Sequence, residues 1–176
     1  MNSTDLTIML SNLAKNLLRV QALLTGAAYI LGLVFVYIGI TRFKGVAEKG
    51  SQERPMVAMA YVLGGAALIF IPTSMDVISN TLFGTGNILE YAKYNRGNIY
   101  SVMGIVIQTA GIIWAIRGIV LIIHASEPGD QEGFKGLTFL IAGILAFNFD
   151  STMAMINSML TQLTSWTIAI KQSQGY

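Results

Sequence analysis

The side chains best suited to bind a charged ligand are four cations in one short polar stretch. They fall within 13 residues, between two apolar segments: Arg42, Lys44, Lys49 and Arg54. Ammonium and guanidinium groups near a membrane bind anionic lipid head groups at about 1 kcal/mol each. The same groups could line a channel for single-stranded DNA or protein. The alternative is a topology signal, since Lys and Arg accumulate in cytoplasmic loops.

Arg117 is a charge inside a long apolar segment. A charge at the centre of a membrane helix costs about 2.5 to 3.5 kcal/mol, so such a residue is usually paired or functional. Arg117 lies about six residues, or roughly 9 Å, from the following polar loop, and a long side chain reaches that boundary by snorkelling. The alternatives are a transport site and an ion pair, either with an acid of another subunit or with the cluster Glu127, Asp130 and Glu132.

Patterns typical of catalysis or metal binding are missing from the sequence. It contains no cysteine and a single histidine, His124, which we expect to be an interfacial residue. Asp76, Glu90 and Asp150 are isolated acids, and we find no glycine-rich phosphate loop, nucleophile elbow or cluster of metal ligands. We therefore expect no enzyme activity, no metal and no cofactor apart from structural phospholipid.

The composition places these charges in a membrane protein. Of 176 residues, 53% are hydrophobic and only 11% are charged, with a mean hydropathy of +0.60. A soluble globule of this size needs more polar residues to cover its surface. The net charge of +2 is too small to argue for wholesale nucleic-acid binding.

Four hydrophobic segments are predicted to be membrane helices: residues 22–40, 55–72, 99–123 and 136–149. The first is uncharged over 19 residues, about 28 Å of helix, close to the roughly 30 Å of a bilayer core. The fourth has only 14 residues, so the sequence leaves open whether it continues past Asp150 into the amphipathic stretch 151–170. The predicted fold is an all-α integral membrane protein of two tandem helical hairpins, with amphipathic N- and C-terminal helices.

The two hairpins are copies of one unit. With a shift of 79 positions, ten of the 39 residues from Gly32 to Phe70 are identical, where composition alone gives roughly three. Gly32, Gly39 and Gly64 recur as Gly111, Gly118 and Gly143. One residue is then dropped, so that Met75 falls on Met153.

The repeat sets the expected domain boundaries. These are an amphipathic N-terminal helix (1–21), a first hairpin repeat (22–82), a connector (83–98), a second hairpin repeat (99–160) and a tail (161–176). Because each copy has an even number of spans, the copies should run parallel. The density of cations in the first turn favours both hairpin turns on the cytoplasmic side.

Glycines are the candidates for helix packing. Their seven-residue spacing places each set along one side of its helix, where close backbone approach stabilises helices in lipid. The set comprises Gly32, Gly39, Gly64, Gly104, Gly111, Gly118, Gly136 and Gly143. The sequence does not tell whether the partner helix belongs to the same chain or to another, and we expect self-association through these faces.

Two tandem hairpins with small-residue helices and short charged turns, KGVAEKGSQERP and SEPGDQEGFK, resemble the TraQ and DotE (IcmC) family of type IVB conjugation and secretion systems. Each hairpin also looks like a conjugative pilin subunit, in which phospholipid accompanies the protein and the basic turn faces the lumen. That likeness makes Arg42, Lys44, Lys49 and Arg54 lumen-facing or lipid-binding. The second turn departs from it, because Lys135 is its only clear cation.

The resemblance implies a structural subunit of a bacterial conjugation or type IVB secretion apparatus, pilin-like or part of an inner-membrane channel. It implies location in the bacterial inner membrane, or extrusion as a pilus. The implied partners are further copies of the chain, other secretion subunits, phospholipid, and single-stranded DNA or protein cargo. The alternative is a small transporter with parallel repeats, in which Gln108, Arg117 and Asp150 converge on a cavity near the midplane.

Overall fold

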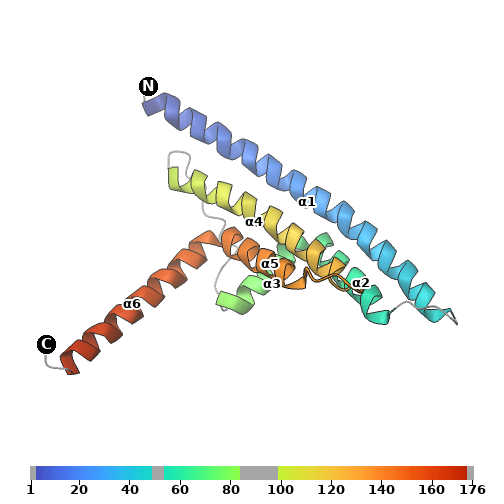
Figure 1. Cartoon of the computed structure of the whole chain (residues 1–176). Helices are drawn as coiled ribbons and strands as arrows, with labels where there is room; N and C mark the ends of the chain where they lie inside the picture. Colours follow the sequence, from blue (N-terminus) through green and yellow to red (C-terminus); the bar gives the residue numbers. More distant parts are fainter. Residues whose placement is uncertain (1–2, 49–53, 84–98, 174–176) are drawn as a thin grey trace.

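The computed structural model describes residues 3–48, 54–83 and 99–173, and these ranges are helical apart from short turns (Figure 1). The described helices are α1 (Ser3–Ala47), α2 (Pro55–Ile69), α3 (Ile71–Phe83), α4 (Ile99–His124), α5 (Gly133–Phe147) and α6 (Phe149–Ser173). No strand occurs within the described ranges, as the all-α prediction requires. Most of the expected connector, with Glu90, lies outside them, and so does Lys49.

Helix α1 joins two elements that the sequence predicted separately. The expected surface helix (1–21) and first span (22–40) form one helix of 45 residues, about 68 Å long. No proline interrupts it, and its internal glycines cost too little to end a helix that is packed along its side.

Two helices are long and apolar enough to cross a membrane, Ser11–Ala47 within α1 and Ser101–His124 within α4. The number becomes three if α5 and α6 are counted as one bent span. Helix α2 has 15 residues, about 22 Å, against the roughly 20 residues of an ordinary crossing. Over the described residues the structure thus supports two or three spans where the sequence predicted four.

Backbone-to-backbone contact joins α1 to α2 and α4 to α5. A Cβ built on Gly32 would lie 2.6 Å from the carbonyl oxygen of Gly65, and one built on Gly39 would lie 2.9 Å from the nitrogen of Val62. In the second pair, Cβ atoms on Gly111 and Gly143 would each lie 2.7 Å from the other's carbonyl oxygen. Both pairs run antiparallel, because later residues of one helix meet earlier residues of its partner.

Helices α1 and α4 lie side by side and run in the same direction (Figure 1). Gln21 of α1 contacts Thr109 of α4, and further along both helices Phe35 contacts His124. The core between them and α2 is apolar, with Ala28, Leu68 and Ala115 fully buried. The parallel order of α1 and α4 is the order expected of a duplicated hairpin.

The structure shows that the one-residue deletion in the second repeat lies at a different position from the one expected. Gly65, not Gly64, packs on Gly32 as Gly143 packs on Gly111. The second helix of each repeat therefore corresponds at a shift of 78, and the deletion lies before α2 rather than after Phe70. The sequence alignment chose Gly64 because Gly64 and Gly65 are adjacent and either can be matched to Gly143.

Both repeats break at the same place and hold the break in the same way. Helix α2 ends at Ile69, where Pro72 cannot donate the N–H of the next turn, and α5 ends at Phe147 before Asn148. The hydroxyl of Ser74 donates to the carbonyl of Ala67 at 3.2 Å. In the second repeat Thr152 donates to Leu145 at 2.8 Å, and Asn148 donates to Ile144 at 3.1 Å. The hydroxyls of Ser74 and Thr152 thus occupy carbonyls near the break, whereas the Asn148 side chain shares the Ile144 carbonyl with its own backbone N–H.

After the breaks the two copies differ. In α3, Ile71 and Met75 are each 1% exposed against the core. Helix α6 instead makes an angle of 93° with α5 and extends away from the other helices (Figure 1). Its residue Met153, the counterpart of Met75, is 40% exposed. The fourth segment therefore does not continue as a straight span past Asp150.

Candidate functional site

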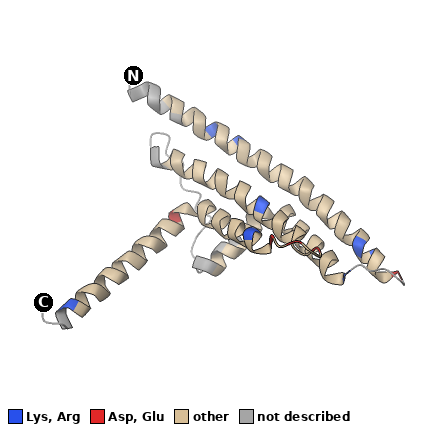
Figure 2. Cartoon of the chain, viewed as in Figure 1, with Lys and Arg blue, Asp and Glu red and all other residues tan. Residues whose placement is uncertain are grey.

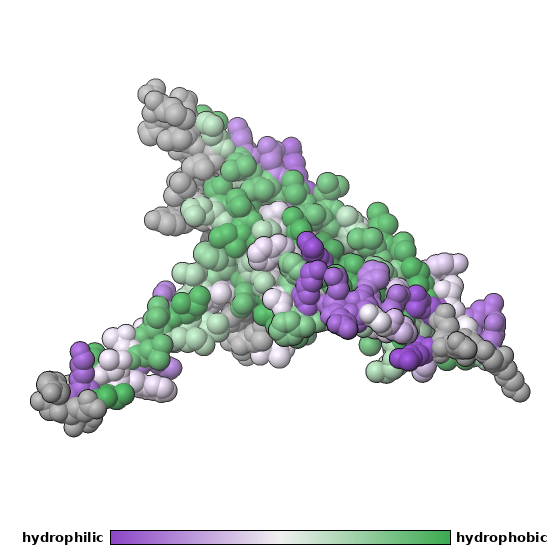
Figure 3. Space-filling view, in the orientation of Figure 1, coloured by the Kyte–Doolittle hydropathy of each residue, from purple (hydrophilic) through white to green (hydrophobic). Residues whose placement is uncertain are grey.

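Charges gather at two levels of the molecule (Figure 2). Lys15 and Arg19 lie shortly before Gln21 in α1, and Asp150 lies shortly after the end of α5, whereas a larger group lies where α1, α2 and the α4–α5 turn meet, which we call the turn end. From Arg19 to Arg42, α1 rises about 35 Å, close to the thickness of a bilayer core. Hydrophilic residues gather toward the turn end in Figure 3, while hydrophobic residues cover much of the rest of that view. This spacing fits a helix bundle with a polar group at each membrane boundary.

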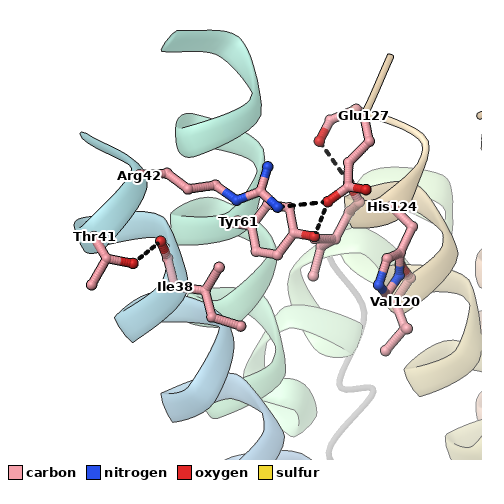
Figure 4. A network of polar contacts seen from close by, with 9 residues as sticks. Ile38, Thr41, Arg42, Tyr61, Val120, His124 and Glu127 are labelled. Atoms are coloured by element: carbon pink, nitrogen blue, oxygen red, sulfur yellow. Dashed lines mark hydrogen bonds and ion pairs between the residues drawn. The ribbon is translucent and has the colours of Figure 1, made fainter. Parts of the chain in front are cut away.

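The turn end contains a polar cluster of Arg42, Tyr61 and Glu127 (Figure 4). Arg42 donates from Nη2 to Oε1 of Glu127 at 2.8 Å, and the Tyr61 hydroxyl donates to the same oxygen at 2.5 Å. The Arg42 guanidinium also lies 4.5 Å from the centre of the Tyr61 ring. One carboxylate thus connects α1, α2 and the turn after α4.

An aromatic layer lies beneath this cluster. The rings of Phe35, Tyr61 and His124 meet edge to face, with centres 5.7 to 6.3 Å apart. His124 Nδ1 is 2.9 Å from the carbonyl oxygen of Val120, which directs the ring along its own helix. His124 therefore packs against Phe35 and Tyr61 inside the bundle, whereas we expected only a position at the membrane interface.

Local turn geometry brings Glu127 to this place. Its N–H donates to the carbonyl of His124 at 2.9 Å, and the hydroxyl of Ser126 donates to that of Ile123 at 2.6 Å. Gly129 then has a φ of +93°, a conformation that favours glycine. The chain makes one tight turn directly after α4, and this turn keeps Glu127 close to the ends of the helices.

The environment favours the ionised form of Glu127. The hydrogen bond from Tyr61 lowers the pKa of the Glu127 carboxyl most. Burial, the next largest effect, raises this pKa, and the charge and hydrogen bond of Arg42 lower it again, so that the pKa lies below its ordinary value. The side chains of Arg42 and Glu127 are 29% and 35% exposed. The pair is thus partly shielded from water and salt.

The structure gives the predicted cations different surroundings. Arg42 is held by Glu127, whereas Lys44 and Arg54 are exposed at the turn end. Lys49 lies outside the described ranges. Lys135 forms an ion pair with Glu132 at 2.9 Å. Among described residues of the first loop, Lys44 and Arg54 remain available to an anionic ligand.

Arg117 has no acidic partner among the described residues. Its guanidinium lies 4.7 Å from the ring centre of Phe139, the counterpart of Tyr61, and the residue is exposed. Of the three acids considered for it, Glu127 pairs with Arg42, Glu132 pairs with Lys135, and Asp130 accepts the N–H of Glu132. The surroundings suit a cation that lies against an aromatic ring.

The predicted glycines do not form one class. Those at contacts between helices are Gly32, Gly39, Gly111, Gly118, Gly136 and Gly143, all buried, and Gly64, whose added Cβ would meet the side chain of Ile123. A Cβ on Gly104 would meet nothing within 4 Å. The glycine contacts between α1 and α2 and between α4 and α5, which we call the glycine seams, are thus made within one chain. Self-association through them would require the hairpins to open.

The three residues that a transporter would bring together stay apart. Gln108 is half-buried in α4, whereas Arg117 and Asp150 are exposed on α4 and at the start of α6. No described hydrogen bond, ion pair or ring contact joins any two of them. The described residues also contain no group of three His, Asp or Glu side chains able to hold a metal ion.

Sequence reasoning missed Tyr61 and the Arg42–Glu127 pair. Tyr61 lies in a run of apolar residues and its counterpart Phe139 has no hydroxyl, so the repeat gave no signal. A usable signal was the position of Arg42 and Glu127, each a few residues past an apolar helix that the duplication makes parallel.

Comparison with protein families, curated proteins and solved structures finds no match.

Proposed function

We propose that this protein is a structural, membrane-embedded subunit of a bacterial conjugation or type IVB secretion apparatus in the inner membrane. It acts as a building block, pilin-like or part of a channel, rather than as an enzyme. Copies of the chain and other subunits surround it, and DNA or protein cargo passes the assembly.

The observation that carries the proposal is the close packing of both hairpins. At Gly32 with Gly65 in the first hairpin, and at Gly111 with Gly143 in the second, the backbones lie so close that an added Cβ would come within 3.0 Å of a facing carbonyl oxygen. Helices in such contact cannot slide or separate without losing it. A rigid unit of this kind suits a scaffold.

The arrangement in the membrane follows from the two polar levels. The hydrophobic helices α1, α2, α4 and α5 lie as two hairpins in the bilayer, with the turn end on the cytoplasmic side. There Lys44 and Arg54 are placed to retain phospholipid head groups. Arg117 lies about 10 Å of helix before His124, deeper in the bundle than these two cations.

A transporter is less well supported by the same observations. Alternating access needs a site near the midplane and two halves that move against each other. The residues expected at such a site, Gln108, Arg117 and Asp150, are not brought together, and the Arg42–Glu127 pair ties the two repeats at one end.

The test is transfer of DNA or protein by the bacterium that carries this protein. Deleting the protein should lower transfer, and the wild-type chain should restore it. Gly118→Leu should fail to restore transfer, because its side chain would collide with α5, while Gly104→Leu, in open space, should restore it. Undiminished transfer in the deletion strain would refute the proposal, as would a purified monomer that accumulates a solute in vesicles.

A further inference from the structure

The longest described helix without a covering partner is α6, and it is strongly two-sided. Large apolar side chains lie along one side at Ile156, Leu160 and Leu163, three or four residues apart, and again at Ile170, two turns later. These four are 40%, 56%, 56% and 56% exposed. The opposite side is polar apart from Ile168 and contains Asn157, Ser158, Thr161, Gln162 and Ser165. Such a helix needs an apolar surface on one side only.

The polar side of α6 is uncharged from Ser151 to Ile170, with Asp150 and Lys171 at its two ends. Hydroxyls along it donate within the helix, as from Thr161 to Asn157 and from Thr164 to Leu160. The helix has 25 residues but is not apolar enough to count as a span by itself. Its composition therefore suits a boundary between water and lipid rather than the bilayer core.

The position of the α5–α6 break gives the depth of this helix. A Cβ on Gly111 would lie 2.6 Å from the nitrogen of Phe147, so α5 ends beside Gly111 of α4. Two residues earlier in α4, Thr109 accepts a hydrogen bond from Gln21 at 2.9 Å. Gln21 lies two residues after Arg19, which is about 35 Å of helix before Arg42 of the turn end. The break thus lies near the second polar level.

The direction of α6 follows from the bend. Helix α5 packs antiparallel along α4, which has the length and hydropathy of a membrane crossing. Because α6 makes an angle of 93° with α5, it runs across the bundle axis. A helix that leaves a crossing helix at the polar boundary, at a right angle, lies in the plane of the membrane.

We propose that α6 binds the lipid surface of the leaflet opposite the turn end, with its apolar side in the acyl region and its polar side toward water. Trp166, 67% exposed, is of the residue type that favours this interface. Lipid is the partner favoured over protein because the exposed side offers no charge pattern for a specific partner between the two ends of the helix. The inference depends on membrane insertion of α1 and α4, not on a role in secretion.

The experiment uses the full chain in phosphatidylcholine vesicles, and the natural absence of cysteine makes single-site labelling direct. An environment-sensitive fluorophore is attached at Leu160→Cys, Leu163→Cys, Thr161→Cys and Ser165→Cys, and lipids with shallow or deep spin labels act as quenchers. Ile30→Cys, exposed on α1 midway between Arg19 and Arg42, calibrates the deep position.

The expected result is blue-shifted emission at positions 160 and 163, quenched more by the shallow label than by the deep one. Positions 161 and 165 should emit as in water. In Trp114→Phe, which leaves Trp166 as the only tryptophan, shallow lipids should also quench best. Stronger quenching by the deep label than by the shallow label at all four positions would overturn the proposal in favour of a crossing helix. Positions 160 and 163 shielded from both labels would overturn it in favour of a protein partner.

Discussion

Arg42 of α1 and Glu127 after α4 are 85 residues apart in sequence, and their side chains meet at 2.8 Å. The pair joins the two copies of a duplicated hairpin but has no equivalent with the copies exchanged: Glu48 corresponds to Glu127, but position 121, the equivalent of Arg42, is leucine. This tie therefore belongs to the assembled pair of repeats and not to either repeat alone.

Breaking this pair should destabilise the contact between repeats. In a double-mutant cycle of Arg42→Gln and Glu127→Gln, we expect a coupling of about 1 kcal/mol, because both side chains are partly shielded. The measurement is the free energy of unfolding in detergent. The Lys135–Glu132 pair, 51% and 44% exposed, serves as control and should couple by less than about 0.5 kcal/mol. Equal couplings for the two pairs would contradict the prediction.

The same pair predicts a pH dependence. Because folding lowers the pKa of Glu127, its contribution to stability is complete above the carboxyl's ordinary pKa and is lost as the pH falls through the lowered value. Wild type and Glu127→Gln should therefore differ at pH 7 and converge in acid. Tyr61→Phe removes the largest cause of the shift, so convergence should begin at a higher pH. Thermal melts across this range provide the measurement.

Glycine seams should be intolerant of any side chain. In Gly118→Ala the new Cβ would lie 2.5 Å from the nitrogen of Leu140, and we expect a loss of about 2 kcal/mol in unfolding free energy. Gly104→Ala has open space and should be neutral or slightly stabilising. If both variants unfold like wild type, the α4–α5 seam is not as close as described. A change in oligomer size alone, with unchanged stability, would instead favour the intermolecular role expected from the sequence.

Lipid retention should depend on the exposed cations of the turn end. We expect Lys44→Glu with Arg54→Glu to reduce co-purified anionic phospholipid, since each cation contributes about 1 kcal/mol of attraction. Lys15→Glu with Arg19→Glu, an equal charge reversal at the opposite level, should reduce it less. Native mass spectrometry of the purified protein counts the bound lipids. Equal losses in the two variants would leave the turn as a topology signal only.

Parallel repeats should place both turns on one side of the membrane. Cysteines at Arg54→Cys and Asp130→Cys, both exposed, should react with an impermeant reagent from the same side. Lys15→Cys should react from the other side. Labelling of positions 54 and 130 from opposite sides would exclude the parallel arrangement of α1 and α4.

The sequence was sufficient for the helical class, the duplication and the polar turns, because these depend on hydropathy and on residue identity at a fixed shift. It did not predict the continuity of α1, since the change from an amphipathic pattern to an apolar one near Gln21 changes the helix's surroundings without breaking the backbone. It predicted a break near Pro72 but not the one at Asn148. No proline follows α5 there, and the side chains of Asn148 and Thr152 donate hydrogen bonds to carbonyls of α5.

Contacts between repeats were the least predictable part. The choice of Glu127 as partner for Arg42 rather than Arg117 depends on how far α4 is displaced along α1, and no single-residue pattern contains that displacement. The register of Gly65 was ambiguous for a simpler reason, because an adjacent glycine satisfied the alignment equally well.

That displacement limits the symmetry of any larger assembly. Thr109, which contacts Gln21, is the equivalent of Ile30 in the first repeat, and His124, which contacts Phe35, is the equivalent of Gly45. The second repeat is therefore shifted by nine to ten residues, on the order of 14 Å, along the helix axis. The two repeats are therefore related by a rotation combined with a translation along the helix axis, and not by a pure rotation of the kind that closes into a ring. Further copies reusing this contact would climb out of a flat bilayer, so a planar ring must use another surface, while a filament outside the membrane could accommodate the rise.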